Sequence, residues 1–273
     1  MARFQHDHVP GSLTLVLNAS EGLLQLILAD EATMLCRQEW DAPTRSTEIL
    51  APALRQMLSG LGLAPAHVGR IACVRGPGSF TGIRLILATA AALRRTTGAR
   101  TAGLDYLEAL ARGAGRLSLP PQAGQAVWVL THARRDLVHA RRFVWQAGGR
   151  PAASGPAELL PPAEAAARIA QDGSAGLPPV VLGSALERNG ETLRQVCPDA
   201  RFAPDGLRHP DCRDLLSLAQ EAGYADVDIE PLYVRPCDAV DNLPHLAARQ
   251  SIAPEDAEAA LERMLHAAPA STI

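Results

Sequence analysis

A glycine-rich segment, RGPGSFTGIR at residues 75–84, carries the residue types best suited to chemistry. Glycine adopts backbone conformations that other residues avoid and lets a ligand or another chain segment come close. Ser79 or Thr81 can cap a following helix, and the free amides at a helix start attract phosphate. The segment therefore predicts either a loop beside a phosphate or nucleotide, or a tight strand-to-helix connection that only packs.

Three familiar motifs are excluded at this segment. The chain has 26 lysine-plus-arginine residues and all of them are arginine, so it lacks the lysine of a Walker A loop, a pyridoxal Schiff base or a protein kinase. Gly76, Gly78 and Gly82 miss the dinucleotide-binding spacing G-x-G-x-x-G by one position. Pro77 takes the place of the first glycine in the nucleophile elbow G-x-S-x-G around Ser79.

The remaining titratable side chains do not form a recognisable catalytic or metal site. His132 and His139 fall on a predicted hairpin, where structural roles are favoured, and His6 and His8 lie in a polar N-terminal stretch. No H-E-x-x-H occurs. The five cysteines are widely spaced without a C-x-x-C, which is typical of a reducing compartment and of buried thiols. We expect no catalytic residue and no metal ligand from these patterns.

Hydrophobic periodicity places the glycine segment between a strand and a helix. Residues 70–74, RIACV, are almost wholly apolar, as in a strand covered on both faces, and the helix after the segment runs to about Thr97 with Gly98 at its end. Before them, the pattern predicts a three-stranded antiparallel meander and a helix capped by Ser46 or Thr47, over 13–18, 23–29, 33–40 and 46–60. A strand at 100–102 and a helix at 105–112 follow.

A Gly- and Pro-rich stretch at 113–124 separates a second unit. Its pattern predicts a hairpin, a helix, a strand, a second helix and an extended segment, at 125–145, 163–171, 178–185, 211–223 and 229–236. We therefore predict two domains, 12–112 and 123–236, and a C-terminal extension, 237–273, with one helix at 254–266. A length of 273 residues suits two domains of modest size.

Charge and hydropathy exclude two classes of function. A net charge of −3 argues against free-standing nucleic-acid binding. No apolar run approaches the length that spans a bilayer, and the polar N-terminus does not read as a signal peptide. We therefore expect a cytoplasmic protein without membrane contact.

At GPGSFTGIR the sequence closely resembles the TsaB family, partner subunits in tRNA threonylcarbamoyladenosine biosynthesis related to the glycoprotease-like group of the actin-like ATPase superfamily. Further matches, including STEILAPALRQML, VLTHARRDLVHARRF and EPLYVR, spread the resemblance over about residues 13–236. The resemblance implies an α/β fold of two ribonuclease-H-like or actin-like domains, with mixed sheets flanked by helices.

The resemblance also implies a degenerate paralogue of an enzyme rather than the enzyme. The catalytic relative, TsaD, carries two metal-binding histidines, and the corresponding places fall near Asp105 and Ala109; alanine cannot bind a metal. The superfamily's first turn carries an Asp for Mg²⁺ and phosphate, where this chain has an asparagine. The nucleotide-type loop that the resemblance implies comprises Asn18, Ser20, Gly76, Pro77, Gly78, Ser79, Phe80, Thr81 and Gly82. No cofactor is required, and weak ATP or ADP binding is left open.

In this family the two helices that flank the 70–74 strand hold the TsaD-type catalytic subunit. The implied interface comprises Leu50, Leu54, Leu58, Ile83, Leu87 and Ala90; the alternative is that these side chains face their own sheet. Expected partners are a TsaD-like subunit and a TsaE-like ATPase, with tRNA reached only through the complex. A homodimer through the same surface is left open.

Two other functions remain as alternatives. One is an ATP-dependent phosphotransferase of the actin-like fold, which Asn18 disfavours. The other is a metalloprotease, suggested by the family's older name, which the missing histidine pair disfavours.

Overall fold

The computed structural model describes residues 9–42, 44–134, 136–174, 176–204 and 207–234, together with residues 247, 253, 255, 256, 259, 260 and 263. The chain divides into a unit that ends at Leu232 and a second unit that begins at Tyr233. Most of the helix predicted at 254–266 lies outside the described residues, and the predicted extension at 237–273 stays a prediction.

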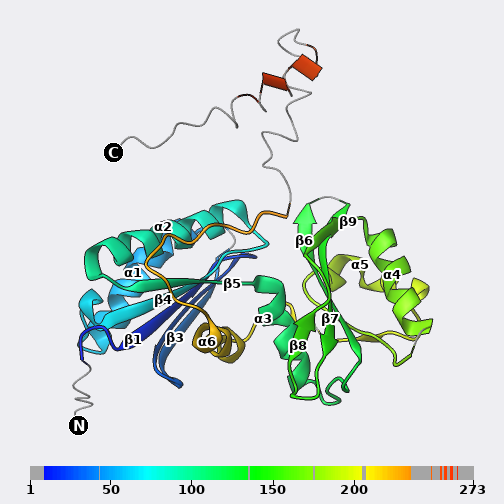
Figure 1. Cartoon of the computed structure of the whole chain (residues 1–273), viewed down its shortest axis with the longest axis horizontal. Coiled ribbons are helices and arrows are strands. Elements are labelled where there is room, and N and C mark those ends of the chain that lie inside the picture. Colours follow the sequence, from blue (N-terminus) through cyan, green and yellow to red (C-terminus); the bar gives the residue numbers. More distant parts are fainter. Residues whose placement is uncertain are drawn as a thin grey trace. The chain divides into compact units, whose positions relative to one another are not determined.

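The first sheet has five strands in the order β3-β2-β1-β4-β5 (Figure 1). Its strands are β1 Leu13–Asn18, β2 Leu23–Asp30, β3 Thr33–Asp41, β4 Val68–Val74 and β5 Arg100–Leu104. The first three are antiparallel neighbours, whereas β4 and β5 run parallel to β1. The predicted meander is confirmed, and the sheet is mixed. All six residues of β1 are buried, because helices cover both faces of the sheet.

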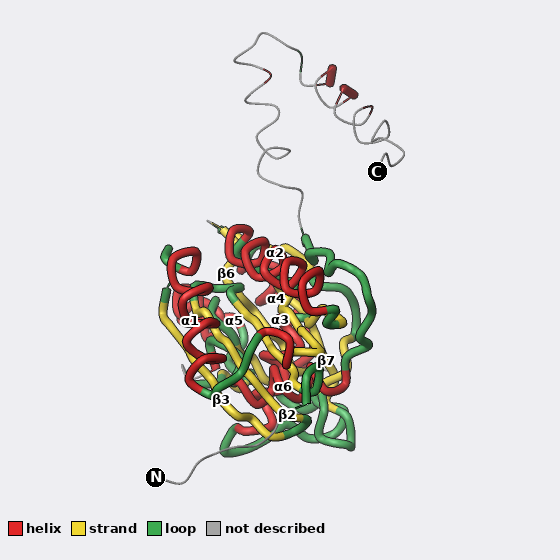
Figure 2. The backbone as a smooth tube through the Cα atoms, turned by 90° about the vertical axis from the view of Figure 1, so that its left-hand side faces the viewer, coloured by secondary structure: helices red, strands yellow, loops and turns green. Residues whose placement is uncertain are grey.

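Two helices cover one face of this sheet, α1 Ser46–Gly60 and α2 Phe80–Thr97 (Figure 2). Helix α2 begins and ends as predicted: the Ser79 hydroxyl accepts a hydrogen bond from the Gly82 N–H, and Gly98 ends the helix in the left-handed conformation. The bounds of α1 are as predicted, but its predicted N-cap is wrong. Arg45 precedes the helix without a side-chain cap hydrogen bond and pairs with Glu48.

The second sheet has six strands, with β11-β10-β6-β7-β8 in order and β9 paired to β7. The predicted hairpin is confirmed as β6 and β7, and helices α4 and α5 cover the outer face. The bounds are β6 Ala126–Arg134, β7 Leu137–Trp145, β8 Pro151–Ala153, β9 Glu158–Leu160, α4 Pro162–Ser174, β10 Val180–Leu182, α5 Leu186–Val196 and β11 Arg201–Phe202. The pattern missed β8, β9 and β11 because two or three residues carry no periodicity, and α5 because its sequence, LERNGETLRQV, is largely polar.

Helices α3 Tyr106–Gly113 and α6 Cys212–Glu221 lie between the two sheets. They share one hydrophobic core with the inner faces of both sheets, including Val16 of β1 and Val129 of β6. Although 211–223 was predicted within the second domain, α6 contacts β1, β2 and β5 of the first sheet. The segment after it also returns there, where Ala225 pairs with Thr101. The fold class is confirmed as α/β with two mixed sheets flanked by helices, while the predicted domain limits stay a prediction.

Candidate functional site

The glycine segment packs against the turn between β1 and β2. The Ser79 N–H donates a hydrogen bond to the carbonyl oxygen of Ser20. A Cβ atom added at Gly78 would overlap that same carbonyl, and one added at Gly82 would overlap the carbonyl of Ala19. The glycines are therefore needed for the close approach of two backbone segments. This contact favours the packing alternative, because the chain's own turn occupies the space beside the glycines.

Asn18 uses its side chain to build that turn. Its Nδ2 donates to Gln25 Oε1 at 2.7 Å, and its Oδ1 accepts from the Ser20 N–H at 3.1 Å. Both Asn18 and Ser20 are buried, and the Ser20 hydroxyl has no hydrogen-bond partner among the described residues. The two residues expected to face a nucleotide therefore lie inside the first domain.

Phe80 and Thr81 lie on the outer side of the same segment. Thr81 and Ser79 line a small pocket of about 290 Å³ with residues from the start of α1, including Ser46 and Thr47. Phe80 is 41% exposed, and the Arg84 guanidinium lies over its ring at 3.8 Å from the ring centroid. The nine residues predicted as one loop site are thus divided between a buried side and an exposed side.

Glu21, which the sequence pattern did not single out, links the two sheets' loops. Its carboxylate accepts hydrogen bonds from the Ser184 hydroxyl at 2.7 Å and from the Tyr106 hydroxyl at 3.0 Å. Ser184 follows β10 of the second sheet, whereas Tyr106 begins α3. The Tyr106 oxygen also lies 3.2 Å from His209 Nδ1. We call these four residues the Glu21 cluster; they come together from four distant segments, so only the tertiary structure reveals them.

The Glu21 cluster is desolvated, and its pKa values reflect this. Burial of the carboxylate raises the pKa of Glu21 to about 7, although hydrogen bonds from Ser184, Tyr106 and the backbone of His132 oppose the shift. Burial and the nearby carboxylate raise the pKa of Tyr106 well above its ordinary value. Burial lowers the pKa of His209. With a neutral hydroxyl at Ser184 and Tyr106 and a His209 whose pKa is lowered, the cluster offers a phosphate no fixed positive charge.

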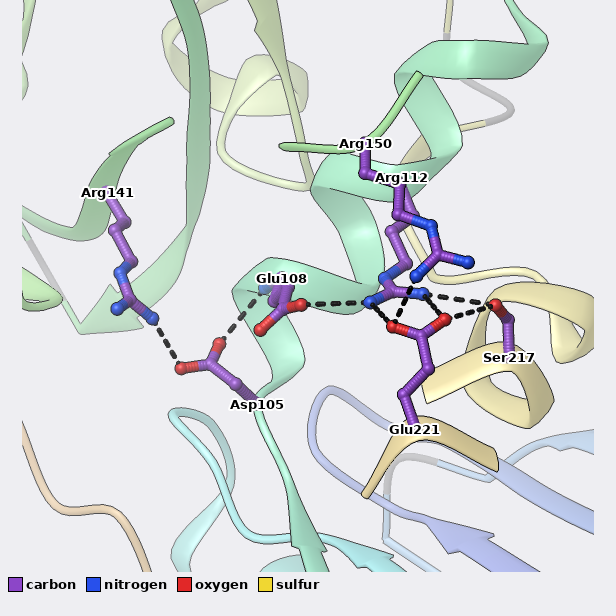
Figure 3. A network of polar contacts seen from close by, with 7 residues as sticks. All are labelled: Asp105, Glu108, Arg112, Arg141, Arg150, Ser217 and Glu221. Atoms are coloured by element: carbon purple, nitrogen blue, oxygen red, sulfur yellow. Dashed lines mark hydrogen bonds and ion pairs between the residues drawn. The ribbon is translucent and has the colours of Figure 1, made fainter. Parts of the chain in front are cut away.

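Asp105 and Ala109, the positions at which the resemblance implies that metal-binding histidines are missing, have structural roles (Figure 3). Asp105 caps α3 by accepting from the Glu108 N–H at 3.0 Å, and its second oxygen accepts from Arg141 Nη1 of β7 at 2.6 Å. Ala109, one turn later, is fully buried. No group of three metal-binding side chains occurs within the described part of the chain. Its four cysteines are free thiols, three of them buried.

A second ion-pair network joins α3 to α6 and to the second sheet (Figure 3). Arg112 of α3 donates to both carboxylate oxygens of Glu221 in α6, at 2.9 and 2.8 Å, and pairs with Glu108 one turn before it. Arg150, which precedes β8, reaches the same Glu221 at 3.0 Å. Together with Asp105 and Arg141, these pairs connect the elements that lie between the sheets.

His132 and His139 both belong to the β6–β7 hairpin. His139 is buried and pairs with Thr131 across the strands. His132 is half-buried at the end of β6, where burial and Arg188 lower its pKa. Its position beside Ser184, whose oxygen accepts from the His132 N–H at 3.0 Å, places it next to the Glu21 cluster.

Most residues of the predicted helix-face interface are buried, which favours the alternative that these side chains face their own sheet. Five of the six residues pack in the first domain's own core: Leu50, Leu54, Leu58, Ile83 and Ala90. Only Leu87 is half-buried. These stripes face the sheet because burying them there stabilises the domain, so a partner can contact only the opposite rows of the helices. Those exposed rows include Ala51 and Arg55 on α1, and Arg84, Ala88 and Ala92 on α2.

Comparison with known proteins gives one family and several similar structures. The family model described as TsaD, tRNA N6-adenosine threonylcarbamoyltransferase, matches residues 41–220. An uncharacterized protein with similarity to peptidase YeaZ from Pseudomonas aeruginosa is 26% identical, with a TM-score of 0.65 over 82% of this chain and 100% of that chain. YeaZ from Pseudomonas aeruginosa is also 26% identical, with a TM-score of 0.62 over 81% of this chain and 99% of its own. No curated protein gave a match. No described helix combines the length and apolar character needed to cross a membrane.

Proposed function

The chain belongs to the TsaD family, tRNA N6-adenosine threonylcarbamoyltransferases, and from this premise we propose that it is a TsaB-type, non-catalytic partner subunit in tRNA modification. In this role it binds a TsaD-type catalytic subunit and keeps that subunit in its active form. A TsaE-like ATPase joins the same complex, and tRNA is reached only through it.

The Glu21 cluster is the observation that carries this proposal. Glu21 directly follows Ser20, whose carbonyl contacts the glycine segment, and its carboxyl group is bound by Ser184 and Tyr106. The side chain of Asn18 forms hydrogen bonds with Gln25 and with the Ser20 N–H, within the turn that contains Glu21. A nucleotide phosphate would find no cationic side chain in this cluster, and the chain has no lysine that could supply one. This arrangement supports a subunit that has given up nucleotide chemistry, so no cofactor is required.

The exposed rows of α1 and α2 support the partner role. Ala88 and Ala92 are exposed on α2, and because their side chains are small, another helix can approach closely there. We call these two residues the strip. Arg84 and Arg95 border the strip on the same helix and are exposed. We therefore assign the contact with the catalytic subunit to this outer surface in place of the buried stripes.

Co-purification with the TsaD-type protein of the same cell tests the partner role. We expect Ala88→Arg to abolish the complex, because a guanidinium on the strip prevents close packing. Ala167→Arg is the matched control: this alanine is also exposed and helical but lies on α4, far along the chain from the strip. Both variants should fold, as circular dichroism would show. If Ala88→Arg still co-purified with the TsaD-type protein, the outer surface of α2 would not be the partner contact.

Measurement of ATP turnover separates this function from an ATP-dependent phosphotransferase of the same fold. We expect the isolated chain to show no turnover with Mg²⁺ and ATP. A robust rate that disappears when Asn18 or Ser79 is substituted would favour the phosphotransferase instead.

A further inference from the structure

A pocket lies at the edge of the first sheet and shares no residue with the Glu21 cluster. It is a pocket of about 460 Å³ between β3 and α6, lined by Met34, Arg37, Arg213, Leu216, Ser217 and Gln220. Nothing in the partner role uses it, because α1 and α2, the helices assigned to the partner, cover the opposite face of the sheet. We call it the β3–α6 pocket.

A β-bulge aims two of these side chains at α6. Leu28 pairs with Cys36 and Ala29 with Met34, so Leu35 is an extra residue in β3. Because of this extra residue, Met34 and Arg37 lie on the same face of the sheet although they are three residues apart. That face is the one covered by α6, since their partners Ala29 and Ile27 belong to the core that α6 shares.

Helix α6 supplies the other wall from a single stripe. Arg213, Leu216, Ser217 and Gln220 follow the i, i+3, i+4, i+7 spacing of one helix face. Leu216 is buried and Met34 packs against the same core, so these two side chains form an apolar floor. Arg37 and Arg213 are exposed at the rim. The pocket thus combines an apolar floor with two cations from different elements.

Several carboxylates lie on the segments that neighbour the two arginines, and Asp211 accepts a hydrogen bond from the Arg213 backbone N–H at 2.7 Å. Neither Arg37 nor Arg213 has an ion pair within the described residues. Asp214 pairs with Arg116, and Glu39 accepts a hydrogen bond from Gln25. Glu221 pairs with Arg112 and Arg150 (Figure 3). Two like charges beside one hollow raise its positive potential, although the whole chain is acidic.

We propose that the β3–α6 pocket binds a small organic phosphate. Arginine forks match phosphate oxygens, and the pocket volume lies in the range of small-molecule sites. The ligand's planar or apolar body lies on Met34 and Leu216. The Gln220 amide nitrogen already donates to the carbonyl oxygen of Glu31 at 3.0 Å, so its amide oxygen remains to accept from a ligand hydroxyl or amino group.

Titration of the full chain with adenosine monophosphate tests the site, with inorganic phosphate and adenosine as the separating probes. Saturation-transfer NMR and calorimetry give the affinity. We expect adenosine monophosphate to bind more tightly than either fragment, with an affinity that falls as salt is raised. Arg37→Gln and Arg213→Gln should each weaken binding by about tenfold, the loss of one charge-assisted contact. Arg55→Gln, which removes an exposed arginine from α1, is the matched control and should leave the affinity unchanged.

Three results would overturn the proposal. The first is the absence of binding by adenosine monophosphate to a chain that circular dichroism shows to be folded. The second is that adenosine or inorganic phosphate binds as tightly as adenosine monophosphate. Equal binding of adenosine would show that the phosphate contributes nothing, and equal binding of inorganic phosphate would show that the apolar body contributes nothing. The third is an affinity that Arg37→Gln and Arg213→Gln reduce no more than Arg55→Gln does. None of these results bears on the partner role, which co-purification tests separately.

Discussion

At the scale of single residues, Glu21 is the side chain with the most distinctive environment. It is an acid whose folded pKa, about 7, lies above its ordinary value of 4.5. Between pH 4.5 and about 7, the Glu21 carboxyl group therefore keeps its proton in the folded state, whereas it is ionised in the unfolded state. Stability that Glu21 contributes is fully present below pH 4.5 and is lost as the pH rises towards 7.

The first prediction concerns this pH dependence. Glu21→Gln removes the titration while keeping the shape of the side chain, so its free energy of unfolding should not share the decline between pH 4.5 and 7. The wild-type chain should lose up to about 3 kcal/mol relative to the variant across this window. Urea unfolding at a series of pH values measures it. Glu191→Gln, on the exposed side of α5, should follow the wild type. Parallel curves for Glu21→Gln and the wild type would contradict the assignment.

The second prediction concerns the glycine segment. Gly82→Ala should lower the free energy of unfolding by about 1–3 kcal/mol, because the new methyl group overlaps the carbonyl of Ala19 and the backbones must separate. Gly60→Ala is the control, since a Cβ there meets open space. If the glycines served a ligand alone, Gly82→Ala would be as stable as the control in chemical denaturation.

At the scale of elements, α3 owes its position to contacts at its start and along its outer side. Asp105 both caps the helix and holds Arg141 of the second sheet. We predict that Asp105→Ala costs about 1–2 kcal/mol through the lost cap and the unpaired arginine. Asp105→Asn keeps the cap but lowers the charge, so it should cost less. Thermal melts of the two variants give the ranking, and equal losses would show that the cap contributes nothing.

The two helices on the opposite face show why a stripe of apolar residues does not identify an interface. Leu54 and Ala90 lie on the faces that the sheet buries, so an arginine there would unfold the first domain instead of testing a partner. Ala88, on the other side of α2, is exposed and tests the partner alone. Helical periodicity gives the angle between side chains, whereas only the position of the sheet decides which stripe remains free.

At the scale of the whole molecule, one core runs through both sheets. Helices α3 and α6 fill the space between the sheets, and α6 follows the second sheet in sequence but packs on the first. We predict that the unit ending at Leu232 unfolds in a single transition. Leu215→Ala, in the shared core, should lower its stability by about 2–5 kcal/mol and shift the whole transition. The prediction would be contradicted if calorimetry resolved two transitions and Leu215→Ala shifted only one of them. The two sheets would then unfold independently.

The sequence by itself determined the elements whose patterns are local. It predicted the meander, the β6–β7 hairpin, a cap at Ser79 or Thr81 and the Gly98 helix end. It also predicted the TsaB-type resemblance, which the TsaD family model and the two YeaZ-type structures support. Tertiary structure alone decided that Glu21 meets Tyr106 and Ser184, that α6 returns to the first sheet, and which faces of α1 and α2 stay exposed. The reason is physical: periodicity, caps and turns depend on neighbours along the chain, whereas burial and the pairing of distant polar groups depend on how whole sheets and helices pack together.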